Sequence, residues 1–164
     1  MAGFSFDRTF DAPLARAALR ASALGLSAGR LLVAGLLIGL LALPAIALGR
    51  FWVGFALILI SRAAALVGRV NAPELAAKLA AIVFAGLPFA FALADPTRAL
   101  AAAFALFGFV AFVSVRRVDT IADLVCTVLF AAACAVTSWF SLIAYALGIA
   151  CFAAAGATLA KDAT

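Results

Sequence analysis

Six long apolar segments follow one another along the chain and constrain its fold more than any other feature. They cover residues 31–49, 51–67, 75–94, 99–115, 120–137 and 140–160, with short polar or aromatic turns between them. About 20 mostly apolar residues in an α-helix cross the hydrocarbon core of a bilayer. The pattern therefore predicts an all-α, polytopic membrane protein with six transmembrane helices.

The composition points to the same class. Of the 164 residues, 69% are hydrophobic and 12% are charged, and the mean hydropathy is +1.28. A soluble domain of this size cannot bury so much apolar surface. The net charge of +5 would favour nucleic-acid binding in a soluble protein, but in a membrane protein it reflects basic cytoplasmic loops. We therefore expect membrane lipids, and no nucleic acid, among the partners.

The positions of the basic residues predict the orientation. If the N-terminus is cytoplasmic, ten of the 12 Lys and Arg residues fall on the cytoplasmic side, and only Arg50 and Arg98 fall on the outer side. The positive-inside rule then assigns both termini to the cytoplasm. The expected organisation is a cytoplasmic N-terminal segment at 1–30, a six-helix transmembrane domain at 31–160 and a cytoplasmic tail at 161–164.

The N-terminal segment is too polar to enter the hydrocarbon core, and it lacks the long apolar region and the cleavage signature of a signal peptide. We expect Pro13 to open a helix that lies on the membrane surface as an interfacial amphipathic helix. A frayed basic tail is the alternative. In the helical arrangement Arg16 and Arg20 share one side, and the other side carries Leu14, Ala17, Ala18, Ala21 and Leu24.

Two stretches carry a resemblance to a known family. ALILISR at 56–62 and FAGLPFAFALADPTRALAAAF at 84–104 resemble parts of the bacterial CDP-alcohol phosphatidyltransferases, and the resemblance extends over residues 5–110. It implies six membrane-spanning helices after an interfacial helix, a place in the bacterial inner membrane and a tendency to form dimers. In that family the sequence between the two stretches carries the signature D-x2-D-G-x2-A-R-x8-G-x3-D-x3-D, whose aspartates hold two divalent metals for phosphoryl transfer.

That signature is missing from this chain. The positions that match the four aspartates are Ala65, Gly68, Ala76 and Ala80, and the loop between the two halves is shorter than in the family. Divalent metals with oxygen ligands need carboxylates, and Glu74 alone cannot hold two of them. We therefore expect a pseudoenzyme with no catalytic residue, no metal site and no cofactor.

Three basic residues lie where the family's active-site cavity would open to the cytoplasm. Arg62, Arg69 and Lys78 are candidates for binding a lipid phosphate, because an arginine fork matches phosphate oxygens. The alternative is that Arg62 extends to the inner membrane surface, and that Arg69 only helps to set the orientation.

Asp123 is the one acidic residue well inside an apolar segment, which makes it a candidate functional residue. We expect a structural salt bridge with its sequence neighbours Arg116 and Arg117. Asp119, four residues earlier, would place a second carboxylate on the same helix face. Cys126, Cys134 and Cys151 all lie in apolar segments, where we expect small buried side chains.

Three functions are compatible with this pattern. The first is a non-catalytic member of the CDP-alcohol phosphatidyltransferase family that acts as a structural or regulatory partner of an active paralogue or of another membrane complex, in a homo- or hetero-oligomer. The second is an active phosphatidyltransferase of phospholipid biosynthesis that releases CMP from a non-standard site built on Glu74, Asp119 and Asp123. The third is a small transporter, although a polar lining is absent from its segments.

Overall fold

The computed structural model describes residues 6–116 and 118–162, and these residues form helices joined by short turns, without any strand. The described elements, in chain order, are α1 (Phe6–Ala23), α2 (Ala28–Ala47), α3 (Phe51–Arg69), α4 (Pro73–Ala94), the short helix η1 (Pro96–Arg98), α5 (Ala99–Val115), α6 (Thr120–Ala135), the short helix η2 (Thr137–Trp139) and α7 (Phe140–Asp162). The predicted all-α class is confirmed.

Each predicted apolar segment corresponds to one helix, with ends that agree within a few residues. Five helical stretches are long and apolar enough to cross a membrane: α2, α3, α4, α7, and the continuous stretch of η1 and α5 over Pro96–Val115. The helix α6 is apolar but has only 16 residues. By length and composition the prediction of six spanning helices therefore holds for five of them.

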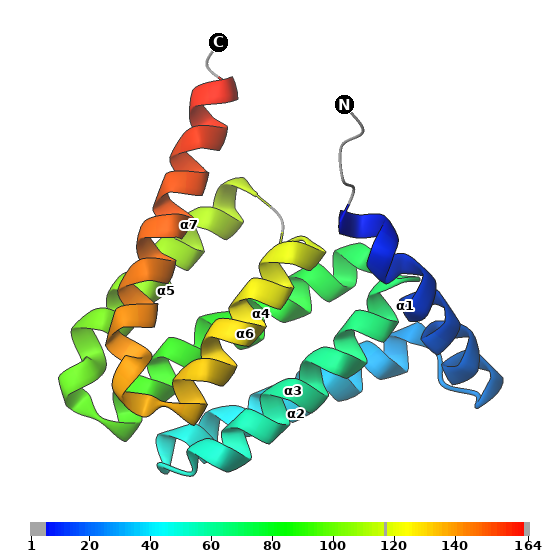
Figure 1. Ribbon diagram of the computed structural model, residues 1–164, viewed down its shortest axis with the longest axis horizontal. Coiled ribbons are helices and arrows are strands. Elements are labelled where there is room, and N and C mark those ends of the chain that lie inside the picture. The colour runs from blue at the N-terminus through cyan, green and yellow to red at the C-terminus, as the bar shows by residue number, and fades with distance from the viewer. Residues whose placement is uncertain (1–5, 117, 163–164) are drawn as a thin grey trace.

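The helices form one bundle that opens at one end. α2 packs against α3 and α4, α5 packs against α7 and α4, and α6 packs against α3 (Figure 1). The turns that join α2 to α3, α4 to α5 and α6 to α7 gather at the lower left of Figure 1, and the end of α7 lies at the opposite side. Successive helices from α2 to α7 therefore run in alternating directions, as the predicted hairpins require.

Phenylalanine rings fill the centre of the bundle. Phe91 of α4 stacks on Phe140 of α7 with ring centroids 4.3 Å apart, and Phe84 of α4 stacks on Phe130 of α6 at 6.2 Å. All four side chains are almost fully buried. Because stacked aromatic pairs add to the attraction from packing alone, α4 is held at the centre by contacts with helices from the C-terminal half.

The helices α5 and α7 approach each other at two glycines. A Cβ atom at Gly108 would lie 2.7 Å from the carbonyl oxygen of Gly148, which is closer than real Cβ contacts allow. Small residues at such a crossing let two backbones come together, and van der Waals packing then stabilises the pair. The close approach at Gly108 and Gly148 thus allows α5 to pack on α7, although α6 and η2 lie between them in the chain.

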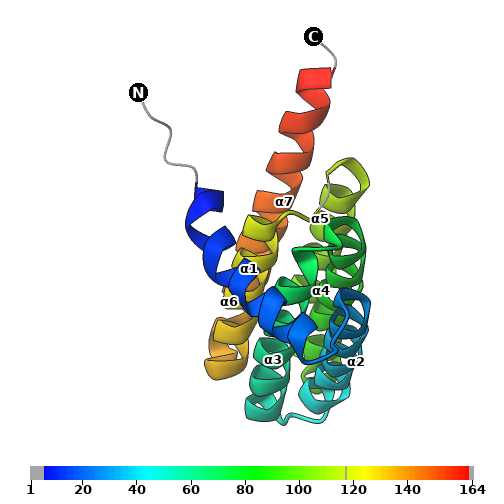
Figure 2. The same ribbon diagram turned by 90° about the vertical axis from the view of Figure 1, so that its right-hand side faces the viewer.

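The first helix departs from its prediction. α1 begins at Phe6, well before Pro13, so the expectation that Pro13 opens the helix is wrong. A proline removes one backbone hydrogen bond, but α1 is helical on both sides of Pro13. α1 runs obliquely across α3 rather than alongside the bundle (Figure 2).

Candidate functional site

The four positions that match the family's aspartates are all buried at the packed faces of α3 and α4. Ala65, Ala76 and Ala80 are all nearly inaccessible, and Ala65 and Ala76 pack with Leu32 of α2 in one small apolar cluster. At Gly68 a Cβ atom would lie 2.8 Å from Cγ of Leu32. These positions hold only alanine and glycine, so no side chain there offers an oxygen ligand for a metal ion.

One buried cluster of charges lies beside this contact. Arg62 and Arg69, seven residues apart, lie on the same side of α3, and both face Asp123 of α6. Nη2 of Arg69 lies 2.8 Å from Oδ2 of Asp123, and Nη1 of Arg62 lies 3.6 Å from Oδ1 of the same carboxylate. The exposed fractions of these side chains are 9% for Arg69, 3% for Arg62 and 1% for Asp123. We call these three residues the Arg–Asp–Arg cluster.

Neighbouring polar groups hold the cluster in place. Nη2 of Arg62 donates a hydrogen bond of 3.1 Å to the hydroxyl of Ser61, which in turn donates one of 2.6 Å to the carbonyl oxygen of Gly35 on α2. The guanidinium of Arg62 also lies over the ring of Phe84, 5.3 Å from its centroid. The cluster therefore connects α2, α3, α4 and α6.

The hydrogen bonding of the Arg–Asp–Arg cluster is incomplete. Nε and Nη1 of Arg62, Nε of Arg69 and Oδ1 of Asp123 are buried and have no hydrogen-bond partner in the described part of the chain. Two guanidinium groups and one carboxylate leave one positive charge uncompensated. The cluster holds α3 and α6 together through the ion pairs of Asp123 with two arginines. A carboxylate that faces two arginines is poorly placed to act as a base or to bind a metal.

The structure separates the three residues that were predicted to bind a lipid phosphate. Arg62 and Arg69 belong to the Arg–Asp–Arg cluster, so Arg62 does not extend to the membrane surface. Lys78 is exposed and lines a hollow of about 260 Å³ between α4 and α5, together with Glu74 and Arg116. Phosphate binding by these residues stays a prediction, and a single site made of all three is not what the fold presents.

The predicted partners of Asp123 need correction. Arg116 pairs with Asp119 over 3.5 Å instead, and Arg117 lies outside the described residues. Asp119 is the N-cap of α6, where its carboxylate accepts a hydrogen bond of 2.7 Å from the backbone N–H of Ala122. Asp119 is exposed and Asp123 is buried, so they do not form a pair of carboxylates on one face. A sequence signal for the true partners was present in the seven-residue spacing of Arg62 and Arg69.

The remaining predicted positions agree with the structure. Cys126, Cys134 and Cys151 are buried and free, as expected for small apolar side chains. Asp95 caps η1 and forms a local turn with Thr97 and Arg98. Its carboxylate accepts hydrogen bonds from the hydroxyl of Thr97 at 2.7 Å and from the backbone N–H of Thr97 at 3.1 Å, and it pairs with Arg98 at 3.1 Å.

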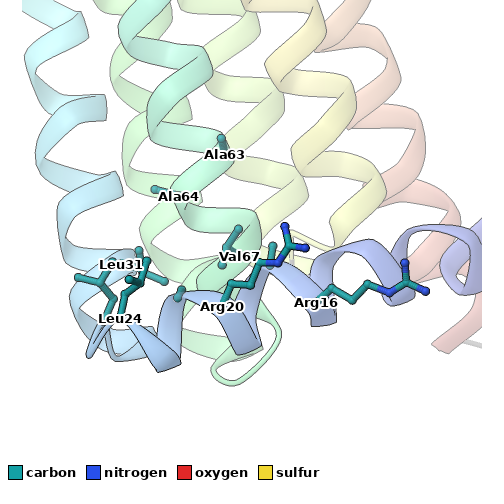
Figure 3. A pocket seen from close by; sticks show the side chains of 10 residues that line it. Arg16, Arg20, Leu24, Leu31, Ala63, Ala64 and Val67 are labelled. Carbon is teal, nitrogen blue, oxygen red and sulfur yellow. The ribbon is translucent and has the colours of Figure 1, made fainter.

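A larger open hollow of about 640 Å³ lies between α1 and α3. Figure 3 shows α1 passing across the end of α3, with the side chain of Arg20 pointing toward the other helices and that of Arg16 extending along α1. These arginines were expected to lie apart from Ala17, Ala21 and Leu24. Instead, all five residues line the same hollow, because residues three, four and seven apart share a helix side. Leu14 lies outside the residues whose side chains are described.

These features define the class of the protein: an all-α chain with five helices of membrane-spanning length, clamped by a buried charge cluster. No protein-family model matches the chain, and neither the curated proteins nor the solved structures compared with it include a match. Membership of the CDP-alcohol phosphatidyltransferase family therefore stays a prediction from the two resembling stretches.

Proposed function

We propose that the chain is a non-catalytic, CDP-alcohol phosphatidyltransferase-like membrane protein that acts as a structural or regulatory partner of another membrane protein. The observation that carries this proposal is the burial of Ala65, Gly68, Ala76 and Ala80, which leaves no carboxylate and no open space at the four matching positions. Phosphoryl transfer by two metals needs carboxylates around an open site. Here the matching positions hold small side chains in van der Waals contact.

The proposal includes six crossings of a bacterial inner membrane, with both termini in the cytoplasm. α6 lies between α5 and α7 in the chain and packs on α3, which is a helix of membrane-spanning length. Its 16 residues span about 24 Å at 1.5 Å per residue. A slightly thinned bilayer accommodates a helix of that length. The excess of basic residues on one side supports the orientation.

In the same arrangement α1 is the interfacial helix. It lies across α3 rather than parallel to it (Figure 3). Leu19 and Leu24 expose 69% and 79% of their surface, as expected of apolar side chains that meet the acyl boundary of a bilayer.

The residues needed for a non-standard active site are engaged elsewhere, which weighs against the second function. Asp123 is held by two arginines, and Asp119 caps α6. Glu74 lines the separate hollow beside Lys78. The described residues contain no group of three or more His, Cys, Asp and Glu side chains arranged to hold a metal ion.

Two measurements on the purified full chain test the proposal. The first is CMP release from CDP-diacylglycerol with magnesium or manganese, with an active phosphatidyltransferase as the positive control. We expect no release, and metal-dependent release would overturn the non-catalytic assignment. The second is the mass of the protein extracted from its own membrane in a mild detergent. We expect a stable complex of defined composition that contains a second membrane protein or a second copy, and a monomer would overturn the association.

A further inference from the structure

We propose that the hollow between α1 and α3 binds an anionic phospholipid of the bilayer, with the lipid phosphate held by Arg16 and Arg20. This inference goes beyond the proposed function. It depends on the membrane placement of the chain, but not on whether the chain is an enzyme or a partner protein.

The hollow has the size and the walls of a lipid site. Its volume of about 640 Å³ lies within the range of small-molecule sites. Its α3 wall consists of Ala63, Ala64 and Val67, whose small side chains leave a shallow apolar surface on the helix side opposite the Arg–Asp–Arg cluster. The rest of the lining, apart from the two arginines, is also apolar: Ala17, Ala21, Leu24, Leu26 and Leu31. Such walls suit the glycerol backbone and the first part of an acyl chain.

The two arginines at the rim of the hollow, Arg16 and Arg20, favour a lipid with a negatively charged headgroup. Arg16 and Arg20 are exposed and lie four residues apart on one side of α1. The guanidinium group of Arg20 points toward the bundle, and the side chain of Arg16 extends along α1 (Figure 3). Among residues 15–116 and 118–161, whose side chains the structure describes, neither arginine forms an ion pair, and the lining contains no acidic side chain. Two guanidinium groups are matched by a phosphate, which arginine binds through paired hydrogen bonds.

The location of the hollow favours a lipid over a soluble phosphate compound. It lies where an oblique helix crosses the end of a helix of membrane-spanning length, so its apolar part faces acyl chains and its basic rim lies at the level of the headgroups. A soluble anion would use the rim alone and leave the apolar wall unoccupied.

Native mass spectrometry of the full chain in detergent tests the proposal. We titrate phosphatidylglycerol, an anionic lipid, and phosphatidylcholine, a zwitterionic lipid with the same acyl chains. We expect one phosphatidylglycerol to stay bound where phosphatidylcholine does not. In the variant Arg16→Gln/Arg20→Gln the affinity should fall at least about tenfold, the loss expected when charge-assisted hydrogen bonds are removed. The charge-matched control Arg30→Gln/Arg50→Gln, outside the lining, should bind as the parent chain does.

A second variant tests the apolar wall without changing the charge. Ala64→Leu/Val67→Phe fills the hollow and should also lose the bound lipid, while circular dichroism and the melting temperature report that the fold is kept. Equal binding of the two lipids, or unchanged binding by the arginine variant, would overturn the proposal. Displacement of the lipid by millimolar inorganic phosphate would show a plain anion site instead, and a doubled protein mass that excludes lipid would show that a second copy fills the hollow.

Discussion

Nη2 of Arg69 on α3 donates a hydrogen bond of 2.8 Å to Oδ2 of Asp123 on α6, and both side chains are buried. This contact joins residues 54 positions apart in the chain. With Arg62 as the second cation, the carboxylate of Asp123 is the only negative charge in the Arg–Asp–Arg cluster. The stability of the α3–α6 contact should therefore depend on this one carboxylate.

Replacing Asp123 by Ala should lower the free energy of unfolding by about 3–5 kcal/mol, because two buried cations then lose their counter-charge. The measurement is chemical unfolding of the purified chain in detergent. The control is Asp119→Asn. This variant removes one charge of an exposed ion pair but keeps a side chain that can cap α6, so the free energy of unfolding should change by no more than about 1 kcal/mol.

The triple variant Arg62→Met/Arg69→Met/Asp123→Leu separates charge from packing. Removing all three charges should recover most of the stability that Asp123→Ala loses, since apolar residues often replace a buried ionic cluster at little cost. If the triple variant were as unstable as the single one, packing at these positions, rather than uncompensated charge, would explain the loss.

Replacing Gly108 by Ala should destabilise the protein by about 1–3 kcal/mol, as expected for overpacking a close contact. The added methyl group would meet the backbone of Gly148, which cannot move as a side chain can. The matched control is Gly156→Ala on α7, where nothing lies within 4 Å of the new Cβ atom. That variant should be neutral or gain up to about 1 kcal/mol from helix propensity. Equal melting temperatures for the two variants would contradict the backbone contact.

The turn at Asp95 should respond to acid. The hydroxyl and the backbone N–H of Thr97, followed by Arg98, stabilise the ionised carboxylate and lower the pKa of Asp95 below its ordinary value. Because the pKa is lower in the folded state, the stabilising contribution is fully present above the unfolded pKa of about 3.9. It is then lost as the pH falls through the folded pKa.

The variant Asp95→Asn checks this pH dependence. Asn can still accept the hydrogen bonds from Thr97 but does not titrate. The melting temperature of the parent chain should exceed that of the variant at pH 7, and the gap should narrow as the pH falls below about 4. A gap that stays constant over this range would show that the charge of Asp95 does not matter to the turn.

Placing aspartates at Ala65, Gly68, Ala76 and Ala80 should give an unstable protein without CMP release. These positions are closed by neighbouring side chains, and unpaired charges there are costly to bury. Catalytic metal ligands also need surrounding groups that orient them. Lys78→Asp, at an exposed position of α4, is the control that adds a carboxylate and should keep the fold. Measurable CMP release by the quadruple variant would show that the site can reopen.

The helices could be predicted from the sequence, but most of their contacts could not. Apolar length and polar turns are local properties, so the ends of α3, α4 and α5 were placed within two residues. The partners of Asp123 were missed because nearby Arg116 was the obvious candidate, whereas the contact with Arg62 and Arg69 depends on how α6 packs on α3. Likewise, the sequence alone does not show that Gly108 and Gly148 are in contact, because this contact depends on how α5 and α7 cross.

The position of Asp123 in the chain has a consequence for biosynthesis. Arg62 and Arg69 leave the ribosome with α3, and two further long helices follow before α6 brings the aspartate. An arginine near the middle of a membrane helix costs about 2.5–3.5 kcal/mol during insertion. A nascent chain that stops before α6 therefore holds two uncompensated cations in its third helix. Only when α6 is made does Asp123 supply a counter-charge to these two arginines, so the buried charge cluster of the bundle forms late in synthesis.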